Sequence, residues 1–189
     1  MKTLKILLII LSVLFIILFL FQCVLLFTSV NKEKEQLEIA NNIINNTREN
    51  EIPVVTKEKL EFNKNVIGIL EIPAINLVAP IQEGTDEEIL KVAIGHFSES
   101  SFWDGNVAFA SHNRSQYVQY FENIHKLKAG DEIIYKTKLG TKTYEVYEST
   151  VIEATDWSVI ENTSENIVTL ITCIKDNPDS RLCVKAKEI

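Results

Sequence analysis

The sequence lacks any concentration of basic side chains. Its 189 residues carry 19 Lys and Arg against 26 Asp and Glu, for a formal net charge of −7 at pH 7. Residues 1–30 hold two lysines and no acidic side chain, so the rest of the chain has a net charge of −9. Nucleic-acid binding requires a basic patch or stripe. We therefore expect no nucleic-acid partner.

Charge is absent altogether from residues 6–27, ILLIILSVLFIILFLFQCVLLF. As a helix these 22 residues measure roughly 33 Å, enough for a hydrocarbon core of roughly 30 Å. The apolar region of a signal peptide is shorter, about 7–15 residues, and ends at a small-residue cleavage site. No A-x-A-like site follows here. The run predicts an uncleaved transmembrane signal anchor, with a cleaved signal peptide as the alternative.

Periodicity is largely missing from residues 31–64, which are rich in Asn, Glu and Lys and predict a polar stalk. We therefore expect three parts: residues 1–30 as a cytosolic tail and transmembrane anchor, 31–64 as the stalk, and 65–189 as the folded domain. Lys and Arg are nearly balanced at the two ends of the apolar run, so the positive-inside rule gives only a small preference. A short tail before a long domain favours the tail inside and the domain outside.

Proline and glycine are few, at 4 and 6 residues, and they separate short apolar segments in the domain. β-Branched residues dominate 66–81, which Pro73 and Pro80 interrupt in the manner of edge strands or bulges. Seven or eight short strands and two short helices predict a mostly-β barrel. Its last strands are expected at 141–154, 166–173 and 181–186.

The acidic segment EGTDEE, residues 83–88, has two interpretations. Thr85 and Glu88 have the spacing of a capping box. Acidic side chains also stabilise the positive end of a helix dipole. We therefore interpret the segment as a helix N-terminus rather than a calcium site, and we expect no metal site and no cofactor.

Cysteine is scarce. Cys23 lies in the uncharged run, and only Cys173 and Cys183 lie in the domain. On an oxidising face of the membrane these two could form a structural disulfide. Cys173 also ends an apolar strand and precedes Arg181 by eight residues. A nearby cation lowers a thiol pKa and activates the nucleophile, so the residues alone leave both interpretations open.

The three histidines differ in context. His112 ends the apolar strand NVAFAS, as Cys173 ends its own strand, which makes it the best proton-transfer partner. His96 follows a glycine and ranks second, although packing and hydrogen bonding explain it better. His125 lies among lysines and is expected in solvent. A Cys–His pair is a general arrangement for covalent catalysis.

The motif TLITC, followed by an arginine and a short strand, resembles the active-site signature of sortases, the cysteine transpeptidases of Gram-positive cell envelopes. The segments IGILEIPAINLVAPIQEGT, GHF…WDGNVAFASHN and YFENIHKLKAGDEIIY are similar to other family segments. Together they cover residues 65–187 in family order. Two departures stand out: Ser111 precedes the histidine where glycine is common, and the stalk has no aspartate–proline–aromatic lid motif. The spacing from Cys173 to Arg181 resembles class A, and the overall pattern class D.

The resemblance implies an eight-stranded sortase-type β-barrel with short helices behind one transmembrane helix. It implies that Cys173 attacks an LPxTG-like sorting signal, with His112 as the proton carrier and Arg181 as the stabiliser of the oxyanion or substrate. It further implies substrate contacts by Val159, Ile160 and Thr172, and an amine of a cell-wall peptidoglycan precursor as acceptor. The expected location is the plasma membrane, with the domain extracellular.

Two other functions remain open at this level. One is a membrane-anchored cysteine peptidase that only hydrolyses its substrate. The other is a non-catalytic extracellular β-barrel held by a Cys173–Cys183 disulfide.

Overall fold

The computed structural model describes residues 14–25, 27–28, 30–31, 34–35, 37–38, 41 and 66–189. The domain contains eight strands, one short α-helix and three single-turn 3-10 helices, the latter labelled η. The elements in chain order are β1 (Val66–Ile72), η2 (Pro73–Ile75), β2 (Leu77–Glu83), α2 (Glu87–Leu90), β3 (Ile94–His96), β4 (Asn106–Ala110), η3 (Ile124–Lys126), β5 (Glu132–Thr137), β6 (Gly140–Glu153), η4 (Trp157–Ile160), β7 (Ile167–Ile174) and β8 (Asn177–Glu188).

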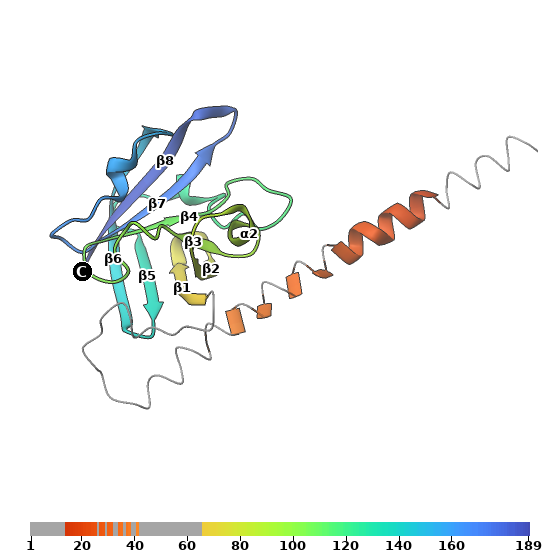
Figure 1. The fold of residues 1–189 in the computed structure, drawn as a ribbon, viewed down its shortest axis with the longest axis horizontal. Coiled ribbons are helices and arrows are strands. Elements are labelled where there is room, and N and C mark those ends of the chain that lie inside the picture. The colour runs from red at the N-terminus through yellow and green to blue at the C-terminus, as the bar shows by residue number, and fades with distance from the viewer. Residues whose placement is uncertain are drawn as a thin grey trace, which may run out of the picture.

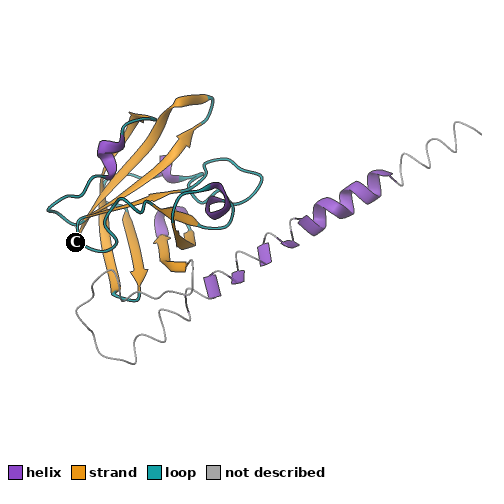
Figure 2. Ribbon diagram, viewed as in Figure 1, coloured by secondary structure: helices purple, strands orange, loops and turns teal. Residues whose placement is uncertain are grey.

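The eight strands close into a barrel in the order β1-β2-β3-β4-β7-β8-β6-β5 (Figures 1 and 2). The neighbours β2–β3 and β4–β7 run parallel, and the other pairs run antiparallel. Closure pairs every strand on both sides and removes the exposed edges that promote aggregation. The predicted mostly-β, eight-stranded barrel with short helices is confirmed.

The barrel interior is filled by aromatic and aliphatic side chains from alternate strand positions. Phe109, Phe121, Tyr135 and Tyr144 are all fully buried. The rings of Phe109 and Tyr135 meet edge to face with centroids 5.2 Å apart. Burial raises the pKa of Tyr135 well above its usual value. Each buried side chain of this size contributes about 1.5–3 kcal/mol to the free energy of unfolding. Because the interior is closely packed, the barrel is also a rigid frame for its surface groups.

The α2 helix begins one residue later than the capping-box pattern predicts. Its N-cap is Asp86, whose carboxylate accepts hydrogen bonds from the N–H groups of Glu88 at 3.1 Å and Ile89 at 3.2 Å. The choice of Thr85 as the cap was wrong, because the adjacent aspartate reaches the free N–H groups of the first turn. The assignment of this acidic segment to a helix N-terminus is correct.

The N-terminal helical residues carry only a part of the predicted membrane span. Residues 14–25 are helical and expose their apolar side chains, among them Phe15 and Phe21. Within the part of the chain that the structure describes, no helix is both long and apolar enough to cross a membrane. Residues 6–13 and 26 of the predicted span, and most of the predicted stalk, lie outside the described residues.

Candidate active site

Cys173 marks the point where β7 emerges from the barrel wall. The six preceding residues, 167–172, are all buried, whereas Cys173 is exposed. Leucine and β-branched side chains suit a strand that is covered on both faces, and β7 lies between β4 and β8. The thiol of Cys173 is free. A central, rigid strand thus presents a free thiol at one end of the barrel.

His112 lies at the same end, two residues beyond β4. Because β4 and β7 are parallel neighbours, both chains leave the barrel wall on the same side; Ala110 is opposite Ile171 in their ladder. Extending that register by two residues on each chain brings His112 level with Cys173. Side chains two residues apart leave the same face of a sheet. The fold therefore brings together two residues that are 61 positions apart in the sequence.

Two hydrogen bonds join the segment around His112 to β7. The hydroxyl of Thr172 donates to the carbonyl oxygen of Ser111 at 2.8 Å. The side-chain amide of Asn113 donates to the carbonyl oxygen of Cys173 at 3.0 Å. These bonds flank the two candidate groups on either side. The position of the imidazole is thereby coupled to the position of the thiol.

Arg181 is directly opposite Cys173 in the antiparallel β7–β8 ladder. Cross-strand partners have Cβ atoms about 4.5–5.5 Å apart, so the two side chains share one face. The Nη1 group of Arg181 donates to the carbonyl oxygens of Pro178 and Ser180, each at 2.8 Å. A guanidinium has five N–H donors. The hairpin backbone therefore orients Arg181 while its Nη2 and Nε donors are left over for a ligand.

The predicted substrate-binding residues fall into two groups. Val159 and Ile160 lie in η4 and are 8% and 7% exposed. They cover an apolar surface on the outer side of β4, β7 and β8, which we call the outer cluster. Its buried members are Phe97, Ala108, Val159, Ile160, Ile171 and Cys183. Thr172 is only 2% exposed, and its hydroxyl is committed to Ser111, so the structure places it inside the wall.

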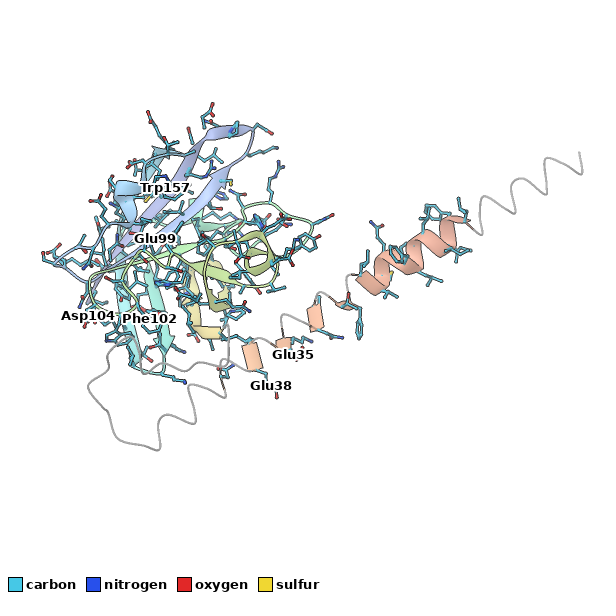
Figure 3. All side chains as sticks on the ribbon, viewed as in Figure 1. Glu35, Glu38, Glu99, Phe102, Asp104 and Trp157 are labelled. Atoms are coloured by element: carbon cyan, nitrogen blue, oxygen red, sulfur yellow. The ribbon has the colours of Figure 1, made fainter. Side chains whose placement is uncertain are left out.

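Trp157, the first residue of η4, lies beside this apolar surface (Figure 3). Its side chain is 60% exposed, and its ring centroid lies 6.2 Å from that of Phe97. Trp103 instead packs against the barrel core. An exposed indole beside a buried apolar cluster offers a contact surface for an extended ligand.

Asn106, a residue that the sequence reasoning did not select, holds η4 on the barrel. It is buried, and its amide donates to the carbonyl oxygens of Val159 at 2.8 Å and Glu161 at 2.9 Å. The hydroxyl of Thr169 donates to the Asn106 side-chain oxygen at 2.8 Å. The sequence feature that could have indicated this role is the asparagine at the start of the apolar strand NVAFA, because a buried amide needs hydrogen-bond partners.

Cys183 has a different environment from Cys173. It is fully buried, lies opposite Ile171 in the ladder, and is a free thiol. Burial raises its pKa to about 11. A thiol with such a pKa is almost entirely protonated at neutral pH and is a poor nucleophile. The structure thus holds the two domain cysteines as separate thiols, without the disulfide of the stapled-barrel alternative.

His96 belongs to a buried hydrogen-bond network away from these residues. Its Nδ1 lies 2.8 Å from a Glu83 carboxylate oxygen, and its Nε2 lies 3.0 Å from the carbonyl oxygen of Ser101. It also lies 3.2 Å from the hydroxyl of Ser100. Both ring nitrogens are occupied by structural partners, which agrees with a packing role. His125 is exposed on η3, as expected.

Among the described residues, no group of three or more His, Cys, Asp or Glu side chains is arranged to hold a metal ion. The groups that this end of the barrel presents are a thiol, an imidazole and a guanidinium.

Comparison with known proteins connects this arrangement to one family. A model of the sortase domain matches residues 70–189. Sortase A of Bacillus anthracis is 30% identical over 127 residues, which cover 67% of this chain and 60% of the relative. Sortase D of Bacillus subtilis (strain 168) is 33% identical over 110 residues, which cover 56% of this chain and 53% of the relative. The chain thus spans less than two thirds of these relatives' length.

The solved structures agree with the barrel topology. The sortase D5 transpeptidase of Clostridium perfringens superposes with a TM-score of 0.63 at 30% identity. The match covers 80% of this chain and 99% of that chain.

Proposed function

The chain belongs to the sortase family, and we propose that it is a cysteine transpeptidase. Its substrate is an LPxTG-like sorting signal on a secreted surface protein, and its acceptor is an amine of a cell-wall peptidoglycan precursor. The observation that carries the proposal is the convergence of three groups at one end of the barrel. The exposed thiol of Cys173 lies level with His112 and opposite Arg181.

In the first half-reaction, the Cys173 thiolate attacks the carbonyl carbon of the Thr–Gly bond. The carbonyl oxygen gains negative charge, and the C–N bond then breaks. His112, as imidazolium, gives its proton to the leaving amine. The products are a thioester on Cys173, a free glycine amine and a neutral imidazole.

In the second half-reaction, the acceptor amine attacks the thioester carbonyl. Neutral His112 takes the proton that this amine loses, and the C–S bond breaks to release the Cys173 thiolate. A new amide bond joins the surface protein to the acceptor. The imidazolium and thiolate are thereby regenerated for the next cycle.

Arg181 acts on the charge that develops between these steps. Its remaining N–H donors face the oxyanion or the substrate backbone next to the thiol. Donors that are oriented before the reaction stabilise developing charge without further reorganisation. The bonds from Nη1 to Pro178 and Ser180 support this role, because they orient the guanidinium of the residue that is opposite Cys173 in the ladder.

We place the apolar part of the sorting signal against η4, at the edge of the outer cluster. The exposed ring of Trp157 supplies the main contact surface there, and Val159 and Ile160, which are 8% and 7% exposed, supply a smaller one. Thr172 acts from inside the wall by positioning the His112 segment.

The N-terminal part is proposed to anchor the enzyme in the plasma membrane, with residues 65–189 outside the cell. The uncharged run 6–27 supports this, as does the exposure of apolar side chains along the helical residues 14–25. An exposed apolar helix is stable in hydrocarbon and unfavourable in water. Residues 31–64 would then form the stalk between membrane and barrel.

The experiment that tests this function measures both half-reactions. The purified full chain in detergent is incubated with an LPxTG-type peptide, with and without triglycine, and intact mass and peptide products are recorded. We expect an acyl adduct on Cys173, absent from Cys173→Ala and retained in Cys183→Ala. With triglycine, a ligated peptide should replace the hydrolysed one.

Two results would contradict the proposal. An adduct that yields only hydrolysed peptide over a full range of triglycine concentrations would indicate the hydrolytic peptidase. An adduct on Cys183, or turnover by Cys173→Ala, would remove the assignment of the nucleophile.

A further inference from the structure

A cavity of about 620 Å³ lies beside Cys173, outside the outer cluster. One side is formed by the segment between β4 and η3, and the other by Ile174, Lys175 and Leu182 of the β7–β8 hairpin. Its size is within the range of small-ligand pockets, about 300–1,000 Å³. Leu182 leaves the face of β8 opposite to that of Arg181. The cavity therefore lies on a different side of the hairpin from the outer cluster.

The charge of this cavity is opposite to that of the whole chain. Arg114, Lys126 and Lys175 line it, together with one carboxylate, that of Glu122. None of the three cations has an ion-pair partner among the residues that the structure describes. Unpaired cations around a concave surface concentrate field lines and attract an anion. In a chain with a net charge of −7, such a cluster needs an explanation.

The remaining lining suits a peptide. Asn113, Gln119 and Asn123 supply side-chain amides, which pair with peptide N–H and C=O groups. His125 adds a further polar group: its Nδ1 donates to the carbonyl oxygen of Glu122 at 2.9 Å, which leaves Nε2 as an acceptor when the ring is neutral.

The cavity borders the candidate active site. Asn113 lines it and also donates to the carbonyl oxygen of Cys173. Ile174, on the opposite wall, is the next residue after Cys173. The residues that directly follow His112, Cys173 and Arg181 therefore all line this cavity.

From these observations we infer that this cavity binds a carboxylate of the acceptor and so selects peptide amines that also carry a carboxylate. The inference rests on the proposed transpeptidase function and assigns the chemical class of its second substrate. Arg114, Lys126 and Lys175 attract the carboxylate, and the amides hold the peptide that joins it to the amine. The same cations repel a protonated amine. They lower its pKa and favour the free base that attacks the thioester.

The first test measures binding without catalysis. Backbone amide shifts of the isotope-labelled full chain in detergent are followed by NMR while N-acetyl-diglycine or its neutral amide is added. We expect N-acetyl-diglycine to shift the backbone amide signals of residues 113–126 and 174–175. Its neutral amide should bind more weakly, by about two- to fivefold in affinity for each cation that contacts the carboxylate. Raised salt should reduce the difference. Inorganic phosphate serves as a third probe.

The second test measures acceptor choice. The ratio of ligated to hydrolysed peptide is compared for triglycine and triglycinamide at low salt. We expect triglycine to be preferred, and Lys126→Gln or Lys175→Gln to reduce the preference about two- to fivefold each. The control is Lys128→Gln, a change at an exposed lysine that does not line the cavity. The amount of acyl adduct without acceptor should be equal in all variants.

The outcomes separate this inference from the proposed function. Equal binding of carboxylate and amide, or an equal effect of Lys128→Gln, overturns the inference. So does tighter binding of phosphate than of carboxylate, because that would indicate a phosphate site. Carboxylate binding that leaves acceptor choice unchanged overturns the acceptor role. A chain that binds the carboxylate in the cavity but never forms an adduct supports the anion site and contradicts the transpeptidase.

Discussion

Cys173 and Arg181 lie opposite each other across the β7–β8 ladder, although Arg181 follows Cys173 by eight positions in the sequence. The hairpin between them begins directly after the thiol, and it also supplies the carbonyl groups of Pro178 and Ser180 that hold the guanidinium. A single hairpin thus carries both the Cys173 thiol and the Arg181 guanidinium. The relative placement of these two groups depends on local hydrogen bonds rather than on distant parts of the fold.

This relationship predicts that Arg181 acts through directed donors and not only through its charge. We expect Arg181→Lys to lower the rate of acyl-adduct formation nearly as much as Arg181→Ala, by about 10²–10³-fold. A lysine keeps the charge but loses the planar set of donors. Stopped-flow or quench measurements of adduct formation check this result.

The matched control for Arg181 is Lys185→Gln, because Lys185 is a half-buried cation on the same strand, four residues further on. Its rate should stay within about twofold of the parent, as expected for a surface change. Full activity in Arg181→Lys would show that charge alone is sufficient and would contradict the directed-donor role.

The buried thiol of Cys183 is expected to make the folded domain less stable at high pH. The folded-state pKa of this thiol is raised to about 11 by burial, above the ordinary value of 9.0. The folded chain therefore keeps a proton that the unfolded chain loses, and stability falls as pH rises from about 9 to about 11. Over this range the contribution is on the order of 2 kcal/mol.

Urea unfolding at several pH values measures this dependence. Tyr135 and Tyr144 also have raised pKa values, so the parent curve contains their contributions. The comparison with Cys183→Ala isolates the thiol: the variant should be less stable at pH 8, with a difference that shrinks by pH 11. A constant difference across this range would show that the thiol does not titrate between these limits.

Most of the barrel follows from local sequence patterns. The long strand β6 and the apolar run of β7 were predicted because β-branched and aromatic residues recur over their full length. The start of α2 was misplaced by one residue, because Thr85 and Asp86 are both good caps and only the chain path selects between them. One of the two expected short helices, that before β5, is a single 3-10 turn at Ile124–Lys126.

The candidate site was predictable only in part. Context and family resemblance indicated Cys173, His112 and Arg181, and the geometry places them at one end of the barrel. Asn106 and the basic cavity were not predicted. Asn106 donates to the carbonyl oxygen of Val159 and accepts from the hydroxyl of Thr169, both more than 50 positions away, and the cavity forms only when two distant segments meet. Non-local contacts of this kind leave no periodic signal in the sequence.

Replacing Asn106 by alanine is expected to weaken substrate binding more than it slows the chemical steps. Asn106→Ala leaves the carbonyl oxygens of Val159 and Glu161 and the hydroxyl of Thr169 without their partner. We expect a loss of about 1–3 kcal/mol in stability. We also expect a KM for the sorting peptide that rises more than kcat falls, because η4 lies at the proposed binding surface and carries no reacting atom.

The comparison for Asn106 is Asn162→Ala, a change at an exposed asparagine of the same connection. Its side-chain oxygen accepts from the hydroxyl of Ser101 at 2.7 Å and from the N–H groups of Thr163 at 3.0 Å and Asn106 at 3.4 Å. Each of these bonds should contribute about 0.5–1.5 kcal/mol. Because the side-chain amide of Asn106 still holds the carbonyl oxygens of Val159 and Glu161 in this variant, KM should change less. If Asn106→Ala lowered kcat with KM unchanged, the residue would act on the reacting groups and not on the groove.

Replacing Ser111 by alanine is expected to stabilise the folded domain. The Ser111 side chain is 4% exposed, and its hydroxyl has no hydrogen-bond partner among the described residues. Burying an unpaired hydroxyl is unfavourable, so Ser111→Ala should raise the free energy of unfolding by about 1 kcal/mol. For a domain of this size the melting temperature should rise by roughly 2–8 °C.

Replacing Ser111 by glycine, the residue common in the family, separates two contributions to stability. These are the buried hydroxyl and the backbone freedom of the unfolded chain. The glycine also removes the hydroxyl, but it adds backbone freedom to the unfolded chain at a cost of about 0.5–1 kcal/mol. Ser111→Gly should therefore be less stable than Ser111→Ala. Ser149→Ala, a change at an exposed position, should have no effect beyond about 0.5 kcal/mol. A destabilised Ser111→Ala would show that the hydroxyl is paired, for instance with a buried water that also supports the carbonyl oxygen of Ser111 and hence the placement of His112.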